Sequence, residues 1–133
     1  MTSVASAADT GLLKGNTKNP CVDPNGTLTY LSSSTSGTPA VQVIAAATGK
    51  KIHICSMSVV GVSGTNPTFS LVYGTGSNCA TGQTVLVPAF ATTAAAIYSF
   101  HGPVAIVPSS NALCYLDAGT TPVQSFIMTY IQQ

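Results

Sequence analysis

From residue 40 onward the chain consists of short β-type runs separated by turn residues. Runs rich in Val, Ile, Thr, Tyr and Phe that are bounded by Gly, Pro, Asn or Ser are typical of strands. Helical periodicity is poor throughout, so the pattern predicts strands rather than helices. Eight runs are present, at 41–44, 51–60, 68–73, 84–87, 96–100, 104–107, 112–116 and 125–131.

Eight short strands at intervals of about ten residues predict an all-β fold. Eight strands in two packed sheets is the number found in a jelly roll. We therefore expect residues 40–133 to form an eight-stranded antiparallel β-sandwich, jelly-roll-like in its topology. The length of 133 residues suits one domain with a core of its own.

Strand alternation predicts which side chains of the second run face the core. Ile52, Ile54 and Val60 fall on one face, and His53, Cys55 and Met57 fall on the other. Both faces carry apolar groups, so we expect this strand to be central or to meet a partner subunit.

Residues 1–39 are rich in Ser, Thr, Gly, Asn and Pro. Such a segment cannot by itself bury enough surface to offset its ordering entropy. A disordered tail and an extended N-terminal arm that orders against a neighbour both fit this composition. Islands of apolar residues favour the arm, and they are our candidate partner contacts: Leu12, Leu13, Leu28, Tyr30 and Leu31.

Ionisable groups are scarce in this chain, which has no Arg and no Glu. Its carboxylates are Asp9, Asp23 and Asp117, and its imidazoles are His53 and His101. Catalytic sites need clusters of such groups. We therefore expect no enzyme activity, no cofactor and no metal site, and we assign no catalytic residue.

Two groups of residues resemble parts of known catalytic or phosphate-binding sites. A triad of either histidine with Asp117 and a serine is arithmetically possible, but no G-x-S-x-G elbow accompanies it. The Gly-rich element 74–82 lacks both the G-K-[ST] ending and the G-x-G-x-x-G spacing of phosphate-binding loops. We expect this element to be a structural loop between strands.

The charge balance limits the partners of the protein. The formal net charge is +1 and the lysines do not form a cluster, which argues against nucleic-acid binding. No apolar run approaches the ~18 residues of a membrane span, and the N-terminus lacks the features of a signal peptide. We expect a protein that is made in a cytoplasm and binds neither nucleic acid nor membrane.

The four cysteines are widely spaced, without a C-x-x-C pair, so zinc is not expected. Since a cytoplasmic product folds in the reduced state, we expect free thiols that pack as small hydrophobic groups. If one bridge exists, we favour Cys79–Cys114, because a loop cysteine and a strand cysteine can meet in a sandwich.

Two segments, 71–82 (Leu-Val-Tyr-Gly-Thr-Gly-Ser-Asn-Cys-Ala-Thr-Gly) and 110–114 (Ser-Asn-Ala-Leu-Cys), resemble a pattern in small structural proteins of tailed bacteriophages. The resemblance covers roughly residues 51–131. In size and texture the chain is also similar to jelly-roll cement or decoration proteins, which bind the outside of phage heads.

This resemblance implies a virion structural protein on the head exterior that cements or decorates the lattice of the major capsid protein. It implies two partners, the major capsid protein and further copies of this chain in a homodimer or homotrimer. Other virion components of similar fold, such as tail, fibre or neck proteins, remain an alternative. A glycan-binding adhesion module is a further alternative, although the chain has no Trp and its tyrosines lie mostly within predicted strands.

Overall fold

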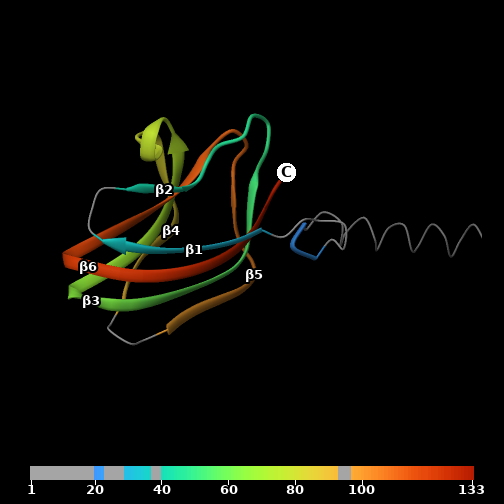
Figure 1. Ribbon diagram of the computed structural model, residues 1–133. Coiled ribbons are helices and arrows are strands. Elements are labelled where there is room, and N and C mark those ends of the chain that lie inside the picture. The colour runs from blue at the N-terminus through green and yellow to red at the C-terminus, as the bar shows by residue number, and fades with distance from the viewer. Residues whose placement is uncertain (1–19, 23–28, 37–39, 93–96) are drawn as a thin grey trace, which may run out of the picture.

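The computed structural model describes residues 20–22, 29–36, 40–92 and 97–133, and in these ranges the protein is all-β (Figure 1). Every strand pairing is antiparallel, as predicted. The elements are the 3-10 turns η1 (Pro20–Val22) and η2 (Ser77–Cys79) and the strands β1 (Thr29–Ser36), β2 (Val41–Ile44), β3 (Ile52–Thr75), β4 (Thr81–Ala91), β5 (Ile97–Val107) and β6 (Ala112–Gln132).

Two long strands, β3 and β6, form the centre of the fold. They pair from Ile52 opposite Gln132 to Gly74 opposite Ala112. β1 and β5 flank one end of this pair, and β2 and β4 flank the other. We call these the β1–β5 half and the β2–β4 half; β3 and β6 pass through both, as their long ribbons in Figure 1 show.

The strand count differs from the sequence expectation of eight, because the predicted runs merge. β3 contains the runs 51–60 and 68–73, and β5 and β6 likewise combine two runs each. The intervening Gly, Asn and Pro residues shift the register of the ladder without ending it. A sixth strand, β1, comes from the segment that the sequence assigned to an arm.

Two glycines allow β3 and β6 to cross closely between the two halves. Gly64 and Gly119 have φ of 120° and 118°. A Cβ on Gly119 would lie 2.7 Å from the carbonyl oxygen of Asn66, and one on Gly64 would lie 2.9 Å from the Cα of Pro122. Only glycine fits both the backbone angle and the close approach.

The larger core cluster contains side chains from both halves. Phe69, in the β2–β4 half, lies 5.6 Å (ring centroids) from Phe126, in the β1–β5 half. Tyr115 and Phe90 extend this aromatic cluster. The fully buried aliphatic residues around it are Ile52, Ile54, Met57, Val59, Leu71, Val107, Leu113 and Met128.

The burial pattern of the first part of β3 departs from the predicted alternation. Met57 is buried in the core, whereas Val60 is only partly buried. A β-bulge between Ile54 and Ser56 is the reason, because the extra residue, Cys55, reverses the alternation after it. The face predicted for Met57 and Val60 was therefore wrong, although Ile52 and Ile54 face inward as expected.

Candidate assembly surface

All four cysteines are paired, in the bridges Cys21–Cys55 and Cys79–Cys114. The expectation of free thiols was therefore wrong. The second bridge joins the pair that the sequence favoured. The paired residues are 34 and 35 positions apart in sequence, so only the long-range strand pairing brings their sulfur atoms together.

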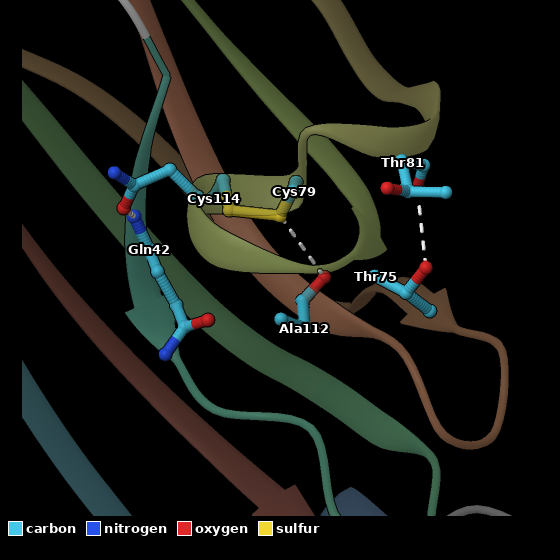
Figure 2. The surroundings of a disulfide bond; sticks show 7 residues. Gln42, Thr75, Cys79, Thr81, Ala112 and Cys114 are labelled. Carbon is cyan, nitrogen blue, oxygen red and sulfur yellow. Dashed lines mark hydrogen bonds between the residues drawn. A yellow bond between two sulfur atoms is a disulfide. The ribbon is translucent and has the colours of Figure 1, made fainter.

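The Cys79–Cys114 bridge fastens the loop between β3 and β4 to β6 (Figure 2). Both cysteines are fully buried, and Cys79 Sγ also lies 3.5 Å from the carbonyl oxygen of Ala112. The Asn78 side chain in this loop accepts a hydrogen bond from the Gln42 backbone N–H at 3.0 Å, which ties in β2. The Gly-rich element 74–82 is thus a structural connection between strands, as predicted.

The Cys21–Cys55 bridge attaches the N-terminal region to the sheet. Cys55 is buried, yet it lies outside the core clusters, at the bulge in β3. The short turn η1, which carries Cys21, contacts both β3 and β6. Pro20, next to the bridge, is buried as well.

The candidate contact residues of the N-terminal segment fall into two groups. Leu12, Leu13 and Leu28 lie outside the described residues. Tyr30 and Leu31 lie in β1, opposite Thr129 and Met128 of β6. Part of the segment 1–39 is thus a strand of the sheet rather than a separate arm, since β1 pairs with β6 along all eight of its residues.

The outer face of the β1–β5 half carries small hydroxyl residues and exposed aliphatic ones. Ser56 and Thr129 share a hydrogen bond at 2.6 Å, and Ser58 and Ser99 share one at 3.1 Å. Beside them, Ile97 is 72% exposed and Ile127 is 46% exposed. A shallow groove of about 370 Å³, the outer groove, is lined by Ser58, Val59, Val60, Ile97, Ser125, Phe126 and Ile127.

The strand edges differ in how well they resist pairing with another chain. Within the described residues, β1, β2, β4 and β5 are each paired on one side only. β2 is four residues long, and β4 and β5 contain Pro88 and Pro103, which limit edge pairing. β1 has eight residues in unbroken register, without proline or charge. Its outer edge is the least protected.

Asp117, the acidic residue of the possible triad, takes part in a buried hydrogen-bond network. Asp117 is fully buried, and its Oδ1 accepts a hydrogen bond from Gln124 Nε2 at 3.2 Å. The same amide donates to the Thr68 carbonyl oxygen at 2.9 Å, and Gln124 Oε1 accepts from the Thr92 hydroxyl at 3.1 Å. This buried network links β3 and β6 to Thr92, the residue that follows β4.

The two histidines are placed apart from this network. His53 lies on β3 opposite Ile106 and Ile131, and His101 lies on β5 opposite Ser56. Burial, and secondarily the charge of Lys51, lowers the pKa of His53. In the part of the chain that the structure describes, no three His, Cys, Asp or Glu side chains come together as metal ligands do. The described residues also include no helix of the length and hydropathy needed to cross a membrane.

No protein-family model matches this sequence, and no curated protein sequence is significantly similar to it. Solved structures do show similarity. A chain from Bacillus endospore appendages, which form a family of disulfide-linked pili, superposes with a TM-score of 0.52 at 17% identity. The match covers 79% of this chain and 85% of that one, so the two proteins share a fold.

Two further structures are more distant. IMPa from Pseudomonas aeruginosa, solved with an O-glycopeptide, gives a TM-score of 0.35 at 14% identity over 81% of this chain and 13% of its own. Infectious bursal disease virus, Gt strain, gives 0.29 at 9% identity over 84% and 40%. At these scores neither match bears on the function.

Proposed function

We propose that this chain is a structural subunit of a bacteriophage virion that binds the outside of the head and decorates the lattice of the major capsid protein. One observation carries the proposal. The described residues include an apolar groove and, at β1, a strand edge without proline or charge, whereas the carboxylate of Asp117 is buried in a hydrogen-bonded network. Surfaces of this kind suit protein contact.

The strand pairing supports a jelly-roll description of the fold. Each half contains four paired strand segments, in the orders β1–β6–β3–β5 and β2–β6–β3–β4. Because β3 and β6 each run through both halves, each contributes one segment to either half. Together with β1, β2, β4 and β5 this makes eight strand segments. A jelly roll is built from two such four-stranded sheets.

The two disulfides favour a final location outside a reducing compartment. Bridges persist on virion surfaces and in other oxidising settings, whereas cytosolic thiols are kept reduced. We infer that the chain is made in the host cytoplasm and that its bridges form or persist on the assembled particle.

The expected partners are the major capsid protein and further copies of this chain, in a homodimer or homotrimer. Repetition on a lattice lets many modest contacts add up to stable attachment. The near-neutral charge does not favour nucleic acid. We propose no enzymatic activity and no cofactor.

A second candidate is a subunit of an extracellular fibre. It is favoured by the fold shared with the endospore appendage chain over 85% of that chain, together with the two disulfides. A tail, fibre or neck component of the virion belongs to the same group of alternatives.

Quantitative mass spectrometry of purified virions tests the proposal. A head decoration protein should be present at a copy number comparable to that of the major capsid protein. A scarce chain on the particle would indicate a tail or neck component, and a chain absent from virions would overturn the proposal. If the protein instead forms fibres, electron microscopy of the purified chain should show them, and their dependence on reductant would favour the second candidate.

A further inference from the structure

Three fully buried polar side chains, those of Thr92, Gln124 and Asp117, meet in one hydrogen-bonded row. The Thr92 hydroxyl donates to Gln124 Oε1 at 3.1 Å, and Gln124 Nε2 donates to Asp117 Oδ1 at 3.2 Å. A single amide group therefore has a hydroxyl at its oxygen and a carboxyl group at its nitrogen. This arrangement holds the parts of an acyl-transfer reaction.

Neighbouring backbone groups fix the positions of the amide and the hydroxyl. Gln124 Nε2 also donates to the Thr68 carbonyl oxygen at 2.9 Å, so both acceptors lie at the nitrogen and set the orientation of the amide. The backbone N–H of Thr92 donates to the Pro67 carbonyl oxygen at 2.9 Å, and the Thr92 hydroxyl lies 3.4 Å from the same oxygen. Groups that are held in this way lose little further freedom when they react.

The chemistry of the three groups suits attack by the hydroxyl on the amide carbon. Gln124 Cδ is bonded directly to Oε1, so Thr92 Oγ1 has only to move from this oxygen to the adjacent carbon. A threonine hydroxyl is a weak nucleophile that needs proton transfer, and Asp117 Oδ1 contacts the nitrogen that must be protonated before it leaves. Burial excludes the water that would otherwise compete for the carbon or hydrolyse the product.

We propose that Thr92 and Gln124 form an ester cross-link within the chain, with Asp117 as the catalytic acid. The bond between Oγ1 and Cδ forms, the bond between Cδ and Nε2 breaks, and ammonia leaves. The hydroxyl proton passes to Oε1, while the Asp117 carboxyl group gives a proton to Nε2 and regains one when the C=O bond re-forms. In total one proton moves from Oγ1 to the leaving nitrogen, and no oxidant or external reactant is needed.

The cross-link joins two parts of the sheet that are 32 residues apart in sequence. Thr92 follows β4 and Gln124 lies on β6, and β3 runs between these two strands in the sheet. The ester therefore fastens the outer strand β4 across the central strand β3. The proposal does not depend on the decoration function, since it concerns the folded chain alone.

Mass spectrometry of the full chain tests the cross-link. After folding, the reduced and denatured chain should be lighter than its sequence by the mass of one ammonia molecule. Chymotrypsin, which cleaves after aromatic residues and leucine, should release residues 91–98 joined to residues 117–126. Hydroxylamine, which cleaves esters, should separate the two purified peptides. A folded chain that keeps its full mass after prolonged incubation near neutral pH would overturn the proposal.

Variants assign the reaction to these residues. Thr92→Val and Gln124→Glu should keep their full mass, whereas Thr92→Ser, which retains a hydroxyl, should still lose ammonia. Thr84→Val, at an exposed threonine of β4, is the matched control and should lose ammonia as the parent does. Ammonia loss that persists in Thr92→Val would place the reaction elsewhere and overturn the proposal. Asp117→Asn should slow the loss by about a hundredfold or more, and an unchanged rate would overturn the role of Asp117.

Discussion

At the scale of single residues, several side chains affect the fold and its stability through backbone geometry or through their charge. Cys55 is one example, because as the extra residue of a bulge it decides that Met57, and not Val60, enters the core. Gly119 is another, because it lets two strands approach to a distance that any Cβ would prevent.

Gly119→Ala should destabilise the fold strongly. The new Cβ would lie 2.7 Å from the Asn66 carbonyl oxygen, at a backbone φ of 118° that disfavours side chains. Strain and displacement together should lower the free energy of unfolding by about 3 kcal/mol or more, as measured by urea unfolding. Gly49→Ala is the control, since its φ is 72° but no atom lies within 4 Å of the new Cβ; it should cost about 1 kcal/mol. Equal losses in the two variants would contradict this account.

His53 should make stability depend on pH in the mildly acidic range. Burial, followed by the Lys51 charge, lowers the pKa of His53 in the folded state below its ordinary value of about 6.5. The unfolded chain therefore binds the proton more readily. Stability from the neutral imidazole is fully present above about pH 6.5 and is lost as the pH falls toward the folded-state pKa.

Thermal unfolding between pH 7.5 and pH 5 measures this effect. The unfolding midpoint of the parent should fall across the range, and the fall should be smaller in His53→Gln. An identical pH profile in the two proteins would show that His53 is not responsible.

At the scale of elements, the disulfides and the bulges define how strands are joined. One bridge fastens the β3–β4 loop to β6, and the other fastens η1 to β3. The first is fully buried, whereas Cys21 of the second is only partly buried. The two bridges close loops of nearly equal size, so they form a natural pair for comparison.

Replacing each bridge by a pair of alanines should distinguish two contributions to the free energy of unfolding, the loop entropy and the burial of the bridge. With sequence separations of 34 and 35, either loss should lower the free energy of unfolding by about 4 kcal/mol on chain-entropy grounds. Cys79→Ala with Cys114→Ala should cost more than Cys21→Ala with Cys55→Ala, because it also leaves a buried cavity. Chemical unfolding of the three proteins measures the difference, and a larger loss from the Cys21–Cys55 variant would refute the ranking.

At the scale of the whole molecule, two halves share β3 and β6 and both contribute side chains to the larger core cluster. Among the residues that the structure describes, the β1 edge and the outer groove both lie on the β1–β5 half. This asymmetry predicts that contacts with further copies or with a lattice use the β1–β5 half.

Charged residues on β1 should reduce self-association without unfolding the domain. Ser32→Lys with Ser34→Lys places two charges on an edge strand that is otherwise uncharged, and charged edges resist pairing. Sedimentation should show a shift toward the monomer, with little change in the unfolding midpoint. Gln83→Lys in the exposed part of β4 is the control; an equal shift there would argue against a specific role for the β1 edge.

The sequence by itself determined the all-β class, the antiparallel strands and the structural nature of the Gly-rich loop, because alternation and turn residues act locally. It also indicated the scarcity of reactive groups. The tertiary structure decided what depends on long-range pairing: the merging of runs into β3, β5 and β6, the inclusion of β1 in the sheet, and both disulfides. It also placed Asp117 in a buried network and gathered the residues of the outer groove from three strands. Residues dozens of positions apart become neighbours only through strand register, and no local pattern encodes that register.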